Sequence, residues 1–376
     1  MIRRVLTEVI KKHNTDNKAI ILLGSRQTGK TTLLKELASG LENVLWLNAD
    51  EPDIQAIFEN ATSTRLNAYF GNFANIFIDE AQRIQDIGIK LKLITDQLPE
   101  KKLFVSGSSA FELANQINEP LTGRKWEYHL YPFSFGELAS HYGFIEETRM
   151  LSHRLVYGCY PEVVTHRGNE KETLKQLTDS FLYKDILQWQ GIKKPEKLLK
   201  LLQALALQVG SEVSYNKLSN LIDLDNETVE KYIQLLEKTF VIFRLTAFSR
   251  NLRKELKKGR KIYFYDNGIR NALIANFNSV ELRTDVGALW ENFILSERIK
   301  YMEYHQIWAN RYFWRTQDQQ EIDFIEERDG KIYAYEFKWN SKLKVRFSKT
   351  FLSAYPDNET KTITPENYFE FIHGTI

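Results

Sequence analysis

Cysteine, a strong net charge and long apolar runs are the features that this sequence lacks. Cys159 is the only cysteine, which excludes an intramolecular disulfide and a cysteine-based zinc site and is typical of a reducing compartment. No run approaches the roughly twenty apolar residues that a membrane-spanning helix needs, and the N-terminus lacks a signal-peptide core. We therefore expect a cytoplasmic protein with no membrane segment.

The charge balance excludes a general attraction to nucleic acid. Lys and Arg number 51 against 49 Asp and Glu, so the net charge is only +2 and any basic surface must be local. With 376 residues, of which 43% are hydrophobic, the chain is globular and long for a single core. We expect two or three domains.

The stretch IILLGSRQTGKTTLL, residues 20–34, predicts a strand, a loop and a helix. Gly24 and Gly29 permit a loop whose N–H groups point at an anion, Lys30 can reach the terminal phosphates, and Thr31 can ligate Mg²⁺. The helix dipole faces the same ligand. The predicted ATP-binding residues are Gly24, Ser25, Arg26, Gln27, Thr28, Gly29, Lys30, Thr31 and Thr32. The alternative is a glycine-containing turn that merely matches a short pattern.

An apolar strand, NIFIDE, ends in two carboxylates. Strands that alternate with helices predict a parallel sheet with sites at the carboxyl ends of the strands. Asp79 could then hold Mg²⁺ through water, and Glu80 could orient or deprotonate the attacking water. The alternative is a helix N-terminus that carries acidic residues for the dipole.

Two further groups could assist phosphate chemistry. Ser106 and, as second choice, Ser108 follow the next strand and could sense the γ-phosphate, although both could simply cap a helix. Arg124 could stabilise transition-state charge within the chain or across a subunit boundary, and Arg26 is its rival. For each arginine the alternative is a solvated side chain.

Successive strings give the chain a family resemblance: GSRQTGKTTLL, IFIDEAQRI, FVSGSSAFEL, LTGRKWEYHLYPFSFGEL and YGCYPEVV. Over nearly its whole length the chain resembles bacterial and archaeal AAA-type ATPases with a C-terminal domain of unknown function. The resemblance implies an ATP-binding domain, residues 1–190, with a helical lid from Ser134 to Gln190. Ser134 and Glu137 read as a capping box that opens the lid. Gly158-Cys159-Tyr160 departs from the glycine pair common in the family, which leaves the role of that turn open.

Residues 191–266 have the outline of a winged helix. The stretch from Gly191 to Pro195 breaks the chain, and three helical patterns and two β runs follow it. The segment between the β runs is basic, as contacts with DNA phosphates require, and contains Arg250, Arg253, Lys254, Lys257, Lys258, Arg260 and Lys261. Three glutamates in NETVEKYIQLLEK argue against deep insertion into a major groove. Docking of a protein partner is the alternative.

Residues 267–376 contain a predicted β-hairpin with acidic side chains. A two-residue turn at Asp329-Gly330 places Asp323 opposite Glu336, about 5 Å apart, where like charges repel. Lys338 shares the face of Glu336, and a divalent metal would offset the repulsion. With Glu291 from a helix, these residues make the D…E-x-K constellation of restriction-endonuclease-like nucleases, which the family's C-terminal domain also resembles. The alternative is a solvated polar pair.

The fold class we expect is therefore α/β: a P-loop NTPase sheet with a helical lid, a winged helix and a restriction-endonuclease-like domain. The first hypothesis is an ATP-hydrolysing protein that associates with DNA and could cleave it with a metal. The second is a nucleotide-dependent switch that binds protein partners and has a catalytically silent nuclease-like domain. The cofactors of both are ATP and Mg²⁺. A homo-oligomer remains open.

Overall fold

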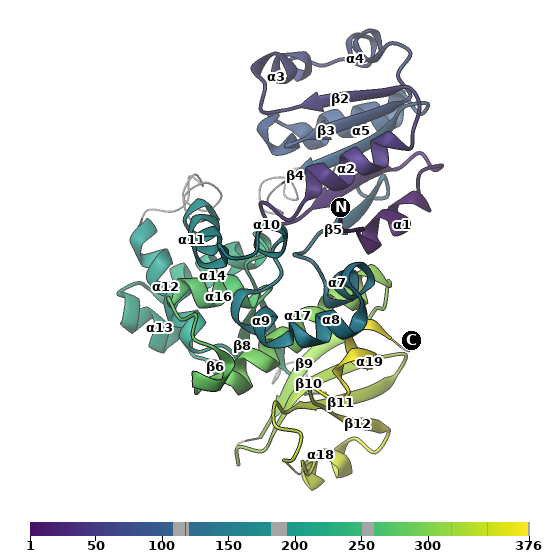
Figure 1. The fold of residues 1–376 in the computed structure, drawn as a ribbon. Helices are drawn as coiled ribbons and strands as arrows, with labels where there is room; N and C mark the ends of the chain where they lie inside the picture. Colours follow the sequence, from purple (N-terminus) through teal and green to yellow (C-terminus); the bar gives the residue numbers. More distant parts are fainter. Residues whose placement is uncertain are drawn as a thin grey trace. The chain divides into compact units, whose positions relative to one another are not determined.

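The computed structural model describes residues 1–107, 117, 120–181, 194–249, 259–316, 318–343 and 345–374. The chain forms two compact units (Figure 1). The first contains Met1–Phe133 and Lys238–Phe240, and the second contains Ser134–Glu237 and Val241–Ile376. Within the described residues, no helix combines the length and apolarity needed to cross a bilayer.

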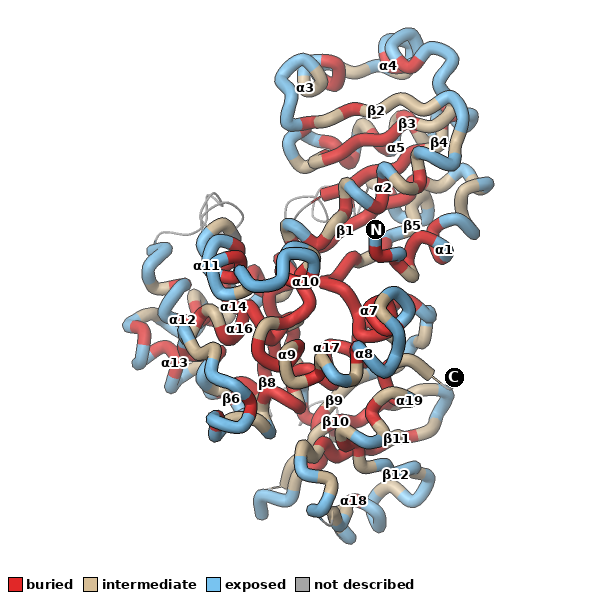
Figure 2. Tube along the Cα trace, in the orientation of Figure 1, coloured by how far each residue is buried: buried red, intermediate tan, exposed pale blue. Residues whose placement is uncertain are grey.

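A five-stranded parallel sheet forms the centre of the first unit, in the order β2-β3-β4-β1-β5. Its strands are β1 (Ala19–Leu23), β2 (Val44–Asn48), β3 (Asn75–Asp79), β4 (Lys102–Gly107) and β5 (Lys125–His129). The helices are α1 (Val5–Lys11), α2 (Lys30–Ser39), α3 (Pro52–Phe58), α4 (Ser63–Phe70) and α5 (Ile87–Gln97), with a 3₁₀ turn η1 (Ala81–Arg83). Every residue of β1 is buried, as its uninterrupted apolar sequence requires (Figure 2).

A seven-stranded mixed sheet forms the second unit, in the order β12-β11-β10-β9-β7-β8-β6. Its strands are β6 (Glu212–Val213), β7 (Ile242–Ala247), β8 (Arg260–Phe264), β9 (Asn310–Arg315), β10 (Glu321–Arg328), β11 (Lys331–Phe337) and β12 (Asn358–Ile363). The helices are α7 (Phe135–Tyr142), α8 (Phe144–Arg149), α9 (Leu151–Tyr157), α10 (Pro161–Thr165), α11 (Glu170–Phe181), α12 (Pro195–Leu207), α13 (Tyr215–Ile222), α14 (Asn226–Lys238), α16 (Asn267–Leu273), α17 (Val286–Tyr304), α18 (Lys349–Ala354) and α19 (Tyr368–His373), with a 3₁₀ turn η3 (Val280–Leu282).

This sheet crosses the boundary that the sequence suggested at 266/267. Strand β7 pairs in parallel with β9, with Thr246 beside Tyr312 and Ala247 beside Phe313. The boundary suggested at 190/191 also falls within the second unit, because residues 134–181 belong to the same unit as the C-terminal sheet. Pro195 marks only where α12 begins, whereas long-range strand pairing and burial decide which segments share a core.

The structure confirms the hairpin register. Phe324 pairs with Tyr335 and Ile325 with Ala334, and Asp329 and Gly330 both have positive φ, 52° and 75°. This geometry matches a two-residue type I′ turn. A register shift relative to β9 lies between Ile322 and Ile325, so Asp323 falls in an irregularity of the strand.

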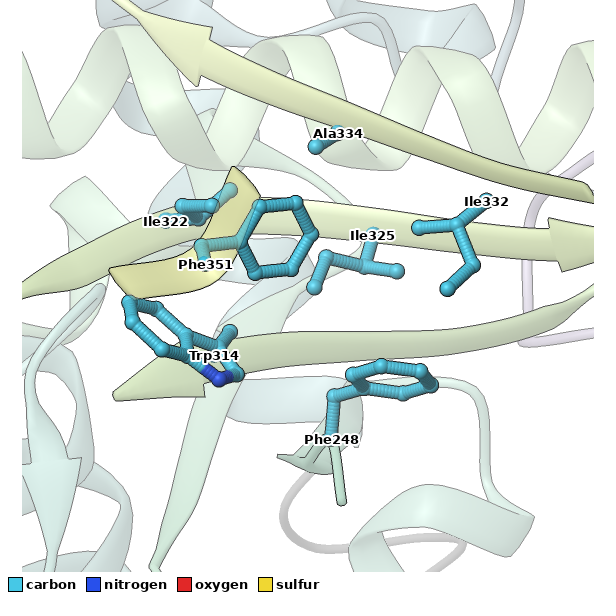
Figure 3. Packing of buried hydrophobic residues seen from close by; sticks show 7 residues of the cluster. All are labelled: Phe248, Trp314, Ile322, Ile325, Ile332, Ala334 and Phe351. Atoms are coloured by element: carbon cyan, nitrogen blue, oxygen red, sulfur yellow. The ribbon is translucent and has the colours of Figure 1, made fainter. Parts of the chain in front are cut away.

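The bulge also explains the core on this part of the sheet. Figure 3 shows side chains of β9, β10 and β11 packed together with Phe351 of α18. Ile322 and Ile325 both belong to this cluster, although residues three apart in a regular strand point to opposite faces. The register shift between them brings both side chains to the same face. The cluster residues are Phe248, Trp314, Ile322, Ile325, Ile332, Ala334 and Phe351.

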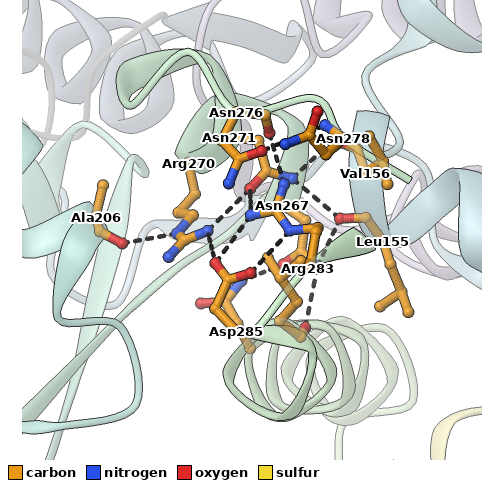
Figure 4. Close-up of polar contacts among 12 residues, drawn as sticks. Leu155, Val156, Ala206, Asn267, Arg270, Asn271, Asn276, Asn278, Arg283 and Asp285 are labelled. Atoms are coloured by element: carbon orange, nitrogen blue, oxygen red, sulfur yellow. Dashed lines mark hydrogen bonds and ion pairs between the residues drawn. The ribbon is translucent and has the colours of Figure 1, made fainter. Parts of the chain in front are cut away.

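Buried polar contacts join α9, α12, α16 and α17 in the second unit (Figure 4). The Asn271 side chain donates to the carbonyls of Leu155 and Val156, and Arg270 donates to the carbonyl of Ala206. Arg270 also contacts Asp285 at 2.7 Å. Burial alone would raise the pKa of Asp285, but hydrogen bonds from Arg283 and Arg270 lower it to about 2.

The turn Gly158-Cys159-Tyr160, whose role the sequence left open, binds the buried carboxylate of Asp266. Asp266 accepts the Cys159 amide at 2.7 Å and the Ile269 amide at 3.1 Å, and so caps α16. Gly158 has a φ of 71°, and a Cβ there would overlap with the Asp266 carboxylate. The turn therefore needs glycine at 158, for its backbone conformation and for the space it leaves.

Replacing Gly158 with Ala should lower the free energy of unfolding of the second unit by at least about 2 kcal/mol, because it combines strain at positive φ with displacement of a buried carboxylate. Urea unfolding followed by fluorescence would measure the change. Gly287→Ala is the matched control, since Gly287 lies in α17 and a Cβ there meets nothing within 4 Å. Equal stabilities of the two variants would contradict this account of Gly158.

Candidate functional site

The loop between β1 and α2 is compact and closely packed. Ser25 and Thr28 are buried, and Thr28 Oγ1 donates to the Ser25 carbonyl at 2.8 Å. Gln27 and Gly29 have positive φ, 59° and 95°. A Cβ at Gly24 would overlap with the Leu130 carbonyl, so this glycine allows a close backbone approach. The loop thus has the conformation of a backbone cradle for an anion.

Lys30 turns its ammonium into this loop. The residue is 5% exposed, and Nζ donates to the carbonyls of Gly24 and Ser25, each at 2.9 Å. Lys30 is the first residue of α2, and Thr31 and Thr32 follow it in the first turn. The positive end of the helix and a buried ammonium therefore lie at the same loop, as phosphate binding requires.

Three neighbouring strands bring the acidic residues to this edge of the sheet. Strand β4 lies between β1 and β3, and its Ser106 pairs in register with Leu22 of β1. The Ser106 hydroxyl donates to Asp79 Oδ1 through a short hydrogen bond and accepts the Glu80 amide at 3.3 Å. Ser106 therefore connects the two carboxylate residues at the carboxyl ends of parallel strands, on the side where the loop begins.

Glu80 is held in an unusual conformation. Its φ is 54°, a strained value for a residue other than glycine, and its Oε2 accepts the Gln82 side-chain amide at 2.5 Å. Sequence reasoning missed Gln82. Its position two residues after the Asp-Glu pair was the available signal.

The two candidate arginines lie in different places. Arg26 is half-buried in the loop. Arg124 directly precedes β5, its carbonyl accepts the Ala19 amide at 2.9 Å, and its side chain pairs with Asp96 at 2.5 Å. It thus lies at the amino end of β1, about 16 Å along the strand from the loop. This placement does not fit a role for Arg124 on a phosphate bound by its own chain, and a role across a subunit boundary stays a prediction. Ser108 lies outside the described residues.

The predicted carboxylates of the C-terminal hairpin come together with a lysine. Asp323 Oδ2 accepts the Phe337 amide at 2.8 Å and lies 3.4 Å from Lys338 Nζ. Lys338 Nζ is also 2.7 Å from Glu336 Oε2. The acidic pair is therefore partly neutralised within the hairpin.

Glu291 of α17 joins this group through a second lysine. Lys261 Nζ of β8 is 3.3 Å from Glu291 Oε1 and 2.5 Å from Glu321 Oε1. The Tyr263 hydroxyl donates to the same Glu291 oxygen at 2.6 Å. We call Glu291, Glu321, Asp323 and Glu336, with Lys261 and Lys338, the carboxylate cluster.

Two carboxyl groups of the cluster have perturbed pKa values. Burial raises the pKa of Glu336 to about 7, and the charge of Asp323 adds to this shift. Burial likewise raises the pKa of Glu291 to about 7, although Lys261 opposes the shift. Near neutral pH the cluster therefore carries less negative charge than its four carboxyl groups suggest.

The carboxylates do not form a preassembled metal site. In the part of the chain that the structure describes, no three His, Cys, Asp or Glu side chains are arranged to hold a metal ion. The expected metal ligands Asp323, Glu336 and Glu291 are close enough to influence one another, but ammonium groups of Lys261 and Lys338 lie against them. No local sequence pattern indicated that β8 would supply a cation here.

Little of the predicted basic wing falls within the described residues. Of its seven cationic residues, only Arg260 and Lys261 are described. Lys261 is buried in the carboxylate cluster, and Arg260 lies 3.9 Å from Glu230 and 4.5 Å from the centroid of the Tyr215 ring. Neither described residue is displayed as an isolated cation for phosphate contact.

Stability should depend on pH through the cluster. The pKa of Glu336 is raised in the folded state. Its contribution to the stability of the fold is therefore fully present below about pH 4.5 and is lost as pH rises through about 7. The free energy of unfolding should therefore fall as pH rises from 5 to 8. In Glu336→Gln this fall should be smaller by on the order of 1–3 kcal/mol, which urea unfolding at both pH values would measure. Glu359→Gln, at an exposed ion pair with Lys331, is the control. Identical pH dependence in wild type and Glu336→Gln would refute the assignment.

Three family models match successive parts of the chain. Residues 16–139 match an AAA domain, residues 148–280 match a domain of unknown function, DUF8612, and residues 286–368 match another, DUF4143. These matches support an AAA-type P-loop ATPase with a C-terminal domain of unknown function.

Individual proteins are also similar to most of this chain. An uncharacterized protein of Mycobacterium tuberculosis is 26% identical over 345 residues, 90% of this chain and 74% of that protein. One of Haemophilus influenzae is 28% identical over 296 residues, 72% of each chain. A solved signal transduction ATPase with numerous domains, with a tetratricopeptide repeat sensor, from Pyrococcus horikoshii is 10% identical. Its TM-score of 0.32, over 81% of this chain and 47% of that chain, is too low to establish a shared fold.

Proposed function

We propose that this protein binds ATP at the loop between β1 and α2 and hydrolyses it. The observation that carries the proposal is the convergence of Lys30, Ser106 and Asp79 at the ends of adjacent parallel strands. In P-loop enzymes this edge of the sheet binds the triphosphate. The AAA-domain match over residues 16–139 supports the same site.

Each residue has a separate task in this proposal. The loop amides and Lys30 bind the β- and γ-phosphates, and Lys30 exchanges its carbonyl contacts for charged phosphate oxygens, which form stronger hydrogen bonds. Glu80 orients the attacking water and accepts its proton. Ser106 positions Glu80 by accepting a hydrogen bond from its main-chain amide.

The oxygen donors of Thr31 and Asp79 fit Mg²⁺. Both are hard ligands of the kind that Mg²⁺ prefers, and they lie on elements that meet at the loop edge. Bound there, Mg²⁺ would supply positive charge that stabilises the transferring phosphoryl group.

For the second unit we propose a binding role, with a winged helix and a catalytically silent nuclease-like domain. The order α12, β6, α13, α14, β7 and β8, with β8 paired to both β6 and β7, supports the winged helix. Lys261, a cation additional to the D…E-x-K constellation, lies against Glu291 and Glu321 and favours silence over metal-dependent cleavage. Arg244, at 3.0 Å from Glu237, and Arg260, at 3.9 Å from Glu230, are paired by glutamates of α14, which favours a protein partner over DNA.

ATP hydrolysis is tested at Lys30. Lys30→Ala should lower kcat for ATP by at least about 100-fold, because the ammonium stabilises charge that develops in the transition state. Phosphate release with Mg²⁺ would measure this loss. Lys35→Ala, at an exposed position five residues further along α2, should hydrolyse ATP like wild type. Normal turnover by Lys30→Ala would overturn the assignment.

Gln82 is proposed as a positioning residue for Glu80. Gln82→Ala should lower kcat about tenfold, or about 1.4 kcal/mol in activation free energy, and leave the KM for ATP unchanged. Gln85→Ala is the control, since Gln85 is an exposed residue of the same type nearby. A rise in KM without a change in kcat would instead assign Gln82 to nucleotide binding.

The binding role is tested with linear duplex DNA at moderate salt, with Mn²⁺ or Mg²⁺ present. We expect neither retardation nor cleavage. Cleavage that disappears in Asp323→Ala would instead establish the nuclease.

A further inference from the structure

We propose that Lys261 is the resident cation of the carboxylate cluster and excludes a divalent metal from it. The inference deepens the proposed silence of the nuclease-like domain, on which it rests, and is independent of ATP hydrolysis. It concerns a residue that the sequence pattern had assigned to a DNA-contacting wing.

The position of Lys261 is fixed by the sheet. Strand β8 lies between β7 and β6, and Lys261 pairs with Leu245 on one side and with Glu212 on the other. The residue is 1% exposed, and its Nζ lies 5.5 Å from the centroid of the Phe313 ring. Strand pairing on both sides fixes the backbone of Lys261, and burial together with two ion pairs holds its ammonium in the cluster.

The ammonium lies against Glu291, one of the expected metal ligands, and against a neighbouring carboxylate. It lies between Glu291 of α17 and Glu321 of β10, at 3.3 Å and 2.5 Å, and the charge of Asp323 acts on it as well. Carboxylate oxygens in direct contact with the ammonium favour its charged form. A divalent cation bound by the same oxygens would be repelled by the ammonium a few ångströms away.

Lys338 does not impose the same block. It is 30% exposed at its side chain, follows β11 and contacts Asp323 and Glu336 from the end of the hairpin. A long, partly solvated side chain can move aside for a cation at little cost. Lys261 lacks this freedom, so it determines whether metal binds.

Removing the charge of Lys261 should therefore create a metal requirement. Buried carboxylates without a counter-charge are strongly destabilising, and a divalent cation would restore the balance. Lys261→Gln keeps a similar size and hydrogen-bonding capacity while removing the positive charge. Lys331→Gln removes an exposed lysine paired with Glu359 and is the matched control.

The experiment is a Mn²⁺ titration without nucleotide, in an Asp79→Asn background that removes the other expected metal ligand. Free Mn²⁺ is counted from its paramagnetic resonance signal, and thermal unfolding is recorded with and without the ion. Lys261→Gln should bind Mn²⁺ at least tenfold more tightly than the parent and gain thermal stability from it. The parent and Lys331→Gln should not respond. Adding Glu291→Gln to Lys261→Gln should weaken the new site.

Folding failure is also informative. If Lys261→Gln refolds only in Mn²⁺ buffer, the inference holds. The inference is overturned if Lys261→Gln stays unfolded in Mn²⁺, or if it folds and does not bind the ion. It is also overturned if the parent already binds Mn²⁺ through Glu291 and Lys261→Gln binds it no more tightly. ATP turnover of Lys261→Gln with intact Asp79 should equal that of wild type, and its loss would not bear on the cluster.

Discussion

A charged side chain withdrawn from water must meet an opposite charge, and this constraint organises the second unit. Desolvation costs several kcal/mol per ion, so unpaired buried charges are rare. Helix α17 buries Glu297, Arg298 and Lys300 within four residues. Glu297 accepts the Phe135 amide at 2.7 Å and the Lys300 ammonium at 2.7 Å, and Arg298 forms a two-pronged pair with Glu326. These contacts join α7, α17 and β10, so the segment resembling a lid shares a unit with the C-terminal sheet.

The same constraint separates the two lysines at the candidate sites. Lys30 donates to main-chain carbonyls, which are neutral dipoles, so a charged phosphate gives its ammonium stronger partners. Lys261 is held by the carboxylates of Glu291 and Glu321, so its charge is balanced by the fold. Both lysines are buried, but the carbonyl contacts of Lys30 are ones for which a bound anion could substitute stronger hydrogen bonds.

Local sequence patterns predicted the features that local physics determines. The loop at Lys30, the strand ending at Asp79 and the turn at Asp329 all depend on residues within a few positions of one another, and all form as expected. The placement of Arg124 and Lys261 depended instead on strand order and on pairings across the chain. The pairing of β7 with β9 joins two expected domains in one sheet. Neither strand alone contains a sequence pattern that predicts this pairing.

A charge that stabilises the fold is not available for binding, and this supports the proposal of a protein partner for the second unit. Basic residues favour DNA only where phosphates can become their partners. Arg244 pairs with Glu237, Arg260 lies near Glu230, and Lys261 is enclosed by carboxylates. Two of the α14 glutamates that argued against major-groove insertion, Glu230 and Glu237, also lie against Arg260 and Arg244 of the ribbon. In the described part of this unit, the paired basic residues therefore support the proposed protein partner over a DNA backbone.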